Sequence, residues 1–130
     1  MKIQTVGVVG SGQMGAGIAQ VCAMAGLQVT LFDLNAQALE QAKLSIESSL
    51  NRLLSKEKIT SEQLAACLQN IENRDEITSL RQADLVIEAA SEQESIKQTI
   101  FKQLDEICKD KTILATNTSS ISITRLAAVT

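Results

Sequence analysis

The sequence contains no histidine and no proline, and its three cysteines form no C-x-x-C pair. The absence of histidine excludes a histidine general base and any histidine-containing metal site within these 130 residues. The widely spaced Cys22, Cys67 and Cys108 give no metal-ligand pattern either, so we predict no metal site. We expect these cysteines to be core-facing helix residues in a reducing compartment.

The sequence also lacks a long apolar run, an excess of positive charge and any low-complexity tract. No segment approaches the roughly 18 consecutive apolar residues of a membrane span, and the short N-terminal apolar run does not resemble a signal peptide. A net charge of −3 argues against nucleic acid as a partner. With 45% hydrophobic and 21% charged residues, the composition indicates an ordinary globular protein, which we expect to be cytoplasmic and without a membrane or nucleic-acid partner.

The segment 6–15 predicts a strand, a tight turn and the beginning of a helix, with glycines in the pattern G-x-G-x-x-G. In a dinucleotide-binding turn, the first glycine bends the chain, the second lets the backbone approach a pyrophosphate, and the third lets the helix pack on the strand. The pyrophosphate then lies on the free N–H groups of the helix N-terminus. Alone, the pattern could mark only a tight turn. The residues that we assign to the cofactor site here are Gly10, Gly12, Gln13, Met14 and Gly15.

A second apolar run, Gln28–Phe32, follows the predicted helix 14–25 and ends at Asp33. Asp33 lies 18 residues beyond Gly15, about where an acid binds the adenosine ribose of a dinucleotide. Because a carboxylate repels a 2′-phosphate, Asp33 favours NAD over NADP. The alternative role of Asp33 is that of an acid that stabilises the N-terminus of the next helix.

The segment after the second strand predicts an antiparallel pair of helices. From Asn35, apolar residues recur at spacings of three and four, which is typical of an amphipathic helix. A polar turn at 55–58 separates it from a second helix, which opens on a capping box of Thr60 and Gln63. The apolar positions of this second helix are expected to be Leu64, Cys67, Leu68 and Ile71. We therefore predict a helical hairpin at about residues 35–70, inserted after the second strand.

Two further buried strands are predicted at 84–90 and 112–116, after a weaker pattern at 71–80 that suits a short strand and a turn. Between these strands, a capping box of Ser91 and Glu94 opens a helix. Its apolar face is expected to contain Ile96, Ile100, Leu104 and Ile107. The alternation of strands and helices predicts an α/β fold of the Rossmann type, a doubly wound and mainly parallel sheet with the helical hairpin inserted.

In an open parallel sheet, ligands bind beyond the carboxyl ends of the strands. Three predicted loops leave such ends, at 10–15, 89–94 and 117–120. We therefore expect Glu92 and Ser119 to face one crevice.

Four segments resemble the N-terminal NAD-binding domain of the 3-hydroxyacyl-CoA dehydrogenases, of which the 3-hydroxybutyryl-CoA dehydrogenases are the short bacterial form. They are G-S-G-Q-M-G-A-G-I-A-Q-V at 10–21, V-T-L-F-D ending at Asp33, D-L-V-I-E-A-A at 84–90 and I-L-A-T-N-T-S-S at 113–120, the last being the most specific. The resemblance covers nearly the whole chain. It implies NAD as cofactor and reversible hydride transfer at C3 of a 3-hydroxyacyl-CoA, in fatty-acid β-oxidation or butanoate-type metabolism.

The resemblance implies roles for four residues outside the glycine turn. Ser119 matches the serine that hydrogen-bonds the substrate 3-oxygen, and Asn117 matches the asparagine beside the nicotinamide; both are candidate catalytic residues. Glu92 and Lys97 match positions that contact the nicotinamide end of the cofactor. The alternatives are a turn or cap role for Ser119 and Asn117, a first-turn acid at Glu92 and a solvated side chain at Lys97. Gln93 departs from the asparagine that the family commonly has.

The predicted hairpin resembles an insertion that helps the family to hold coenzyme A. Arg52, Lys56 and Lys58 surround its turn and could approach the phosphates of an acyl-CoA substrate. A solvated basic turn is an equally good interpretation.

The family's general base is a histidine about twenty residues beyond the N-T-S-S segment, and this chain contains none. We therefore interpret residues 1–130 as one NAD-binding Rossmann domain, truncated at its C-terminal side and without turnover of its own. The absent helical domain would close over the acyl group and form the homodimer. Two alternatives stay open: another 3-hydroxy-acid dehydrogenase with a similar glycine turn, or a stand-alone, non-catalytic NAD-binding module.

Overall fold

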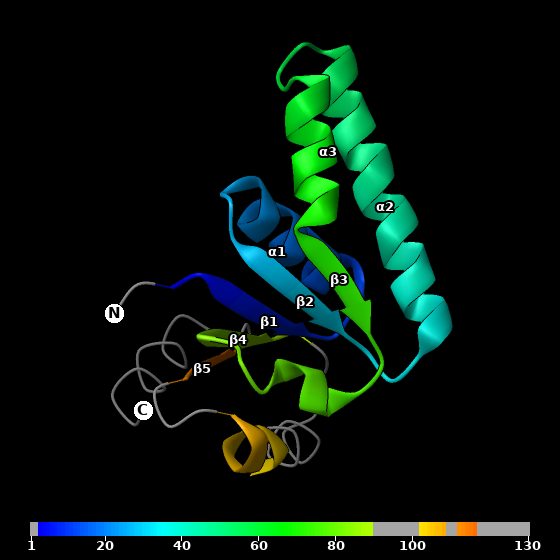
Figure 1. Cartoon of the computed structure of the whole chain (residues 1–130). Helices are drawn as coiled ribbons and strands as arrows, with labels where there is room; N and C mark the ends of the chain where they lie inside the picture. The colour runs from blue at the N-terminus through cyan, green and yellow to red at the C-terminus, as the bar shows by residue number, and fades with distance from the viewer. Residues whose placement is uncertain (1–2, 90–101, 109–111, 117–130) are drawn as a thin grey trace.

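The computed structural model describes residues 3–89, 102–108 and 112–116 and shows one sheet with helices on both faces (Figure 1). In chain order the elements are β1 (Thr5–Val9), α1 (Gln13–Met24), β2 (Gln28–Phe32), α2 (Ala36–Ser55), α3 (Ser61–Gln69), β3 (Ile71–Arg74), the 3-10 helix η1 (Ile77–Leu80), β4 (Leu85–Glu88) and β5 (Ile113–Thr116). Residues 102–107 are also helical.

The five strands are parallel and lie in the order β3-β2-β1-β4-β5. In the centre, Val6 of β1 is the register partner of Val29 on one side and of Leu85 on the other. The chain therefore builds the sheet outward from β1 in one direction and then in the other, which confirms the predicted doubly wound fold. Such an order creates a crevice at the carboxyl ends of β1 and β4, where ligands bind in open α/β sheets.

One face of the sheet is covered by α1, α2 and α3, as Figure 1 shows. The alanines of α1 have short side chains, so this helix lies close to the strands. Leu50 of α2 and Leu31 of β2 are completely buried in this cluster. The buried members of the cluster are Val6, Val8, Ala16, Ala19, Ala23, Val29, Leu31, Leu39, Ala42, Ile46, Leu50 and Cys67. Burying each large aliphatic side chain contributes on the order of 1.5–3 kcal/mol, so this face supplies the larger share of the apolar stabilisation among the described residues.

The opposite face carries η1 and the helical residues 102–107 (Figure 1). Its smaller cluster consists of Val9, Phe32, Leu80, Ala83, Val86 and Leu104. Gly7 of β1 belongs to this face, because a Cβ on Gly7 would lie 2.6 Å from Cδ2 of Leu80. The missing side chain therefore lets Leu80 reach the central strand. Leu104 is buried and Ile107 packs against the cluster, as predicted for that helix, whereas Ile96 and Ile100 lie outside the described residues.

The hairpin formed by α2 and α3 is confirmed, and side chains cap both of its helices. The Asn35 side chain accepts hydrogen bonds from the backbone N–H groups of Gln37 and Ala38. Thr60 and Gln63 form the predicted capping box, each bonding the other's backbone N–H. Such caps satisfy the N–H groups that the first turn of a helix leaves without partners.

Two predictions near the hairpin and beyond it are wrong. Ile71 does not belong to the second helix, because the backbone N–H of Val29 donates to the carbonyl of Asn70 at 2.7 Å and the β2–β3 pairing begins there. Cys108 is not a helix residue but lies in a bend just after residues 102–107. The predicted strand and turn at 71–80 correspond to β3 and η1.

Candidate functional site

In the glycine turn between β1 and α1, each of the three glycines has a different structural role. Gly10 has a φ of 103°, a backbone conformation that favours glycine, and its N–H donates to the carbonyl of Phe32 at 2.8 Å. A Cβ on Gly15 would lie 1.7 Å from the carbonyl oxygen of Gly10, so α1 packs directly on the turn only because Gly15 has no side chain. A Cβ on Gly12 would meet nothing within 4 Å. The space beside Gly12 is therefore open to a ligand.

The N-terminus of α1 is suited to an anion. Gly12 is the N-cap and provides no side-chain cap, and the first turn contains no acidic residue. The first intrahelical bond is donated by Ala16, which leaves the N–H groups of Gln13, Met14 and Gly15 without a helical acceptor. These N–H groups and the positive end of the helix dipole fit the pyrophosphate of a dinucleotide.

Asp33 ties the carboxyl end of β2 to the glycine turn. Its Oδ2 accepts two hydrogen bonds from Ser11, one from the backbone N–H at 2.9 Å and one from the hydroxyl at 2.8 Å. Its Oδ1 accepts a bond from the N–H of Asn35 at 2.9 Å. The N-cap of α2 is Asn35 and not Asp33, although Asp33 accepts a bond from the N–H of that cap residue, as an acid that stabilises the helix N-terminus would. Sequence reasoning did not identify Ser11 as part of this site.

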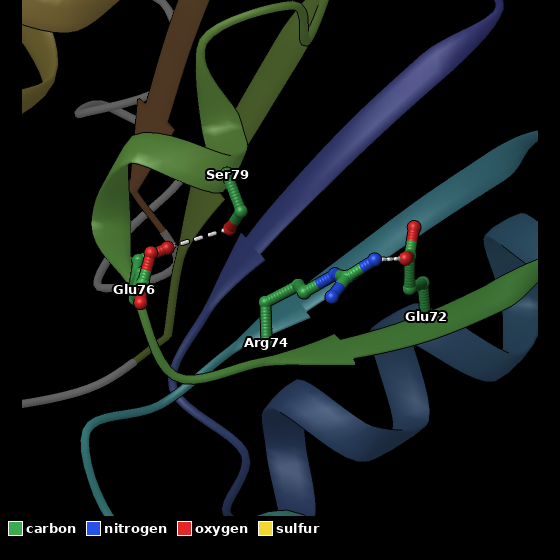
Figure 2. Close-up of polar contacts among 4 residues, drawn as sticks. All are labelled: Glu72, Arg74, Glu76 and Ser79. Atoms are coloured by element: carbon green, nitrogen blue, oxygen red, sulfur yellow. Dashed lines mark hydrogen bonds and ion pairs between the residues drawn. The ribbon is translucent and has the colours of Figure 1, made fainter.

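No basic side chain of β3 points toward the carboxylate of Asp33. Arg74 is the nearest basic residue in the sheet register, as the partner of Phe32, and its guanidinium forms an ion pair with Glu72 on the same strand. Figure 2 shows the Arg74 side chain extending along β3 toward Glu72, away from Ser79. Leu34, which follows Asp33, is 81% exposed. A carboxylate with no cation paired to it among the described residues suits a ribose diol and not a 2′-phosphate.

A polar hollow of about 450 Å³ lies at the β3 edge of the sheet, close to η1. It is lined by Thr30, Glu72, Arg74, Asp75, Glu76, Thr78, Ser79 and Arg81. The Ser79 hydroxyl donates to the backbone carbonyl of Glu76 at 2.6 Å (Figure 2). Acidic side chains outnumber basic ones along this lining, so the hollow is a poor anion site and the glycine turn remains the better one.

The predicted nicotinamide and substrate residues Glu92, Lys97, Asn117 and Ser119 lie outside the described residues. The strands that precede them are described, and their ends are neighbours. Glu88 at the end of β4 is the register partner of Thr116 at the end of β5, and the N–H of Ala89 donates to the carbonyl of Val9 at 2.8 Å. The strand β4 therefore ends between the end of β1 and the end of β5, at one edge of the sheet.

The three basic residues predicted to approach coenzyme A lie far from the glycine turn. Arg52 is in the last turn of α2, and Lys56 and Lys58 follow it at the tip of the hairpin. All three are exposed. Because α2 begins beside Asp33 and has 20 residues, its two ends are roughly 30 Å apart. The structure thus does not bring the basic tip together with the cofactor residues.

The cysteines show no feature of a reactive or metal-binding site. Burial raises the pKa of the thiols of Cys22 and Cys67, and burial with the nearby Asp105 carboxylate raises the pKa of Cys108. A raised pKa keeps a thiol protonated and weakly nucleophilic at neutral pH. The described residues contain no group of three or more possible ligands that could hold a metal ion. Each helix in the described part of the chain is too short or too polar to span a membrane.

Comparisons with known proteins agree with this geometry. The family described as "3-hydroxyacyl-CoA dehydrogenase, NAD binding domain" matches residues 5–130. A 3-hydroxyadipyl-CoA dehydrogenase of Escherichia coli is 48% identical over 98% of this chain, and a 3-hydroxybutyryl-CoA dehydrogenase of Bradyrhizobium diazoefficiens is 45% identical over 98% of it. This chain spans only 27% and 44% of the lengths of these two relatives.

Solved structures give the same result. A crystal structure of a 3-hydroxybutyryl-CoA dehydrogenase from Escherichia coli K12 matches 98% of this chain with a TM-score of 0.91 and 48% identity, and this chain covers 27% of it. A crystal structure of an (S)-3-hydroxybutyryl-CoA dehydrogenase from Ralstonia eutropha matches 99% of this chain with a TM-score of 0.90 and 47% identity, and this chain covers 46% of it.

Proposed function

The chain belongs to the family of 3-hydroxyacyl-CoA dehydrogenase NAD-binding domains, and we propose that the protein containing it transfers a hydride between NAD and C3 of a 3-hydroxyacyl-CoA. The observation that carries the proposal is the glycine turn, where Gly12 opens a space in front of uncapped N–H groups and Asp33 stands beside it. When NAD is bound, it would accept the hydride. The relatives named for 3-hydroxybutyryl-CoA and 3-hydroxyadipyl-CoA support acyl-CoA thioesters as the substrate class.

Within this proposal, the described residues bind and orient the cofactor. The N–H groups of the first turn of α1 hold the pyrophosphate, and Gly10, Gly12 and Gly15 shape the turn. Asp33 accepts hydrogen bonds from the adenosine ribose diol. Gln13 and Met14 are exposed at the start of α1 and flank the pyrophosphate.

The residues nearest the reacting carbon are assigned by resemblance. Ser119 holds the substrate 3-oxygen, Asn117 lies beside the nicotinamide, and Glu92 and Lys97 hold the nicotinamide end. The neighbouring ends of β4 and β5 support this arrangement, because both chain segments leave the sheet at one place. Since the sequence contains no histidine, we propose that a general base from outside these residues accepts the hydroxyl proton.

The basic tip of the hairpin is proposed to bind phosphates of coenzyme A. Arg52, Lys56 and Lys58 are exposed there. Because the tip is remote from the carboxyl ends of the strands, a substrate that reached both places would lie along α2. We further propose that residues 1–130 form one domain of a longer, homodimeric enzyme of fatty-acid or butanoate metabolism, because the chain spans less than half of its curated relatives.

The test is oxidation of 3-hydroxybutyryl-CoA and 3-hydroxyadipyl-CoA by the whole protein, followed by the absorbance of the reduced cofactor with NAD and with NADP in parallel. We expect turnover with at least one thioester and with NAD preferred. Absence of NADH formation with both thioesters, or a preference for NADP, would contradict the proposal. The free 3-hydroxy acids are the matched controls and should react far more slowly, because they lack the coenzyme A that the hairpin is proposed to hold.

A further inference from the structure

Ser11, between the first two glycines of the turn, makes a contact that distinguishes it from its neighbours. Both of its donors bond one oxygen, Oδ2 of Asp33, with the N–H at 2.9 Å and the hydroxyl at 2.8 Å. The residue is 4% exposed, so water competes little for these bonds. Any residue other than proline at position 11 could keep the backbone bond. The hydroxyl bond exists only because this residue is a serine.

The carboxylate of Asp33 is held on both of its oxygens. A carboxylate has about four acceptor positions, and protein donors occupy three of them, two on Oδ2 and one on Oδ1. Turning the carboxylate about its own axis would break the bonds from Ser11 and Asn35 together. Its negative charge therefore has one fixed direction, and the remaining acceptor position is on Oδ1.

We infer that Ser11 is a positioning residue that fixes the Asp33 carboxylate and thereby increases the preference for a ribose diol over a 2′-phosphorylated ribose. A carboxylate whose side chain can rotate about its Cα–Cβ bond can swing its charge away from a 2′-phosphate, and one held on both oxygens cannot. A diol donates to the open acceptor position, whereas a phosphate meets only repulsion. This inference rests on the proposed binding of the ribose by Asp33.

The described residues of β3 provide no second means of discriminating between NAD and NADP. Arg74, the cation nearest in register, is paired with Glu72 and offers no free charge toward a 2′-phosphate (Figure 2). The discrimination between NAD and NADP therefore depends on the charge of Asp33 and on how firmly that charge is held. Ser11 controls the second of these.

The test is Ser11→Ala in the whole protein, with dissociation constants of NAD and NADP measured by calorimetry. Alanine adds no atoms to the site and retains the backbone bond. We expect NAD affinity to fall about 3- to 10-fold, while NADP affinity stays constant or rises, so that the NAD-to-NADP affinity ratio falls at least about 3-fold. A purely structural role would weaken both cofactors equally. Ser79→Ala is the matched control, because it also removes a hydroxyl bonded to the protein, yet it should leave the ratio unchanged.

A double-mutant cycle with Asp33→Ala separates this inference from the proposed function. If Ser11 acts through Asp33, then Ser11→Ala changes the ratio in the wild-type background and not in the Asp33→Ala background. An unchanged ratio in Ser11→Ala, or an equal change in both backgrounds, overturns the inference alone, provided that Asp33→Ala itself weakens NAD. If Asp33→Ala leaves NAD affinity intact, the ribose assignment and the inference fail together.

Discussion

On the sheet face beneath α1, α2 and α3 the side chains are apolar and enclosed, whereas at the carboxyl edge of the same sheet they are polar, exposed or absent. Leu31 and Leu50 on the covered face are 0% exposed. At the edge, Met14 is 58% exposed and Gly12 faces open space. The difference indicates that the face stabilises the fold and leaves the edge available for the cofactor that we propose it binds. Gly15 is the point at which both requirements meet.

The largest effect is expected for Gly15→Ala, which should impair both the packing of the covered face and the binding of NAD at the carboxyl edge. The new Cβ would lie 1.7 Å from the carbonyl oxygen of Gly10, a backbone atom that cannot move aside alone. We expect a loss of roughly 4 kcal/mol or more in the free energy of unfolding, because α1 would be pushed off the turn. Urea denaturation and NAD calorimetry should show stability and binding lost together.

Gly12→Ala is the matched control for that variant. Its Cβ would meet no protein atom within 4 Å, and the backbone φ of −65° suits alanine. We expect a stability change below about 1 kcal/mol but a loss of NAD affinity on the order of 10-fold or more, because the methyl group occupies the space proposed for the pyrophosphate. Equal stability losses in the two variants would show that the glycines do not have separate roles.

Leu50→Ala should affect the covered face without affecting the edge. The side chain is fully buried where α2 packs on α1 and α3, and its truncation leaves a cavity. We expect a loss of about 2–5 kcal/mol in the free energy of unfolding, with NAD affinity of the folded protein unchanged. Leu44→Ala on the same helix, where the side chain is 56% exposed, is the control and should change stability by less than about 0.5 kcal/mol.

Asp33→Ala should produce the opposite result, a binding defect at the edge. Removing the carboxylate that we propose bonds the ribose should weaken NAD binding by about 1.5–3 kcal/mol, or roughly 10- to 100-fold, as measured by calorimetry. Asp75→Ala removes a carboxylate from the nearby hollow and should leave NAD affinity unchanged. If both variants bound NAD like the wild type, Asp33 would have no place in the site.

The smallest effect is expected for Thr60→Ala in the hairpin. It removes one half of the capping box at the start of α3 and should cost about 1 kcal/mol of stability. Thermal unfolding measures the loss, and Thr60→Ser, which keeps a hydroxyl, should restore most of it. NAD affinity should not respond, since the cap lies on the hairpin. A change in NAD affinity would mean that hairpin and edge are coupled.

The fold could be predicted from the sequence because its strong signals are local. The strand Gln28–Phe32 has the predicted boundaries, and the cap at Thr60 and Gln63 is a short-range pattern. Ile71 was assigned to a helix because an apolar residue three positions after Leu68 fits helical spacing. The structure places it in β3, since pairing with β2 is a long-range contact that spacing does not reveal.

The part of the candidate site that depends on backbone geometry could be predicted from the glycine motif. The hydrogen bond between two side chains far apart in the sequence could not. The roles of Gly10 and Gly15 follow from the spacing of the motif and agree with the strained φ and the close approach in the structure. The bond between Ser11 and Asp33 crosses 22 positions of sequence. Serine is also common in turns for unrelated reasons, so its identity gave no sign of that partner.

The central position of β1 has a consequence for synthesis of the chain on the ribosome. One edge of β1 is paired by β2, which follows closely, but the other edge waits for β4, whose residues are 85–88. A nascent chain that has emerged only through β3 therefore contains both hairpin helices and three of the five described strands, with one edge of β1 open. Open strand edges are templates for pairing with other chains. Arrival of β4 closes that edge, so the interval between the emergence of β3 and the emergence of β4 sets how long the edge is open to other chains.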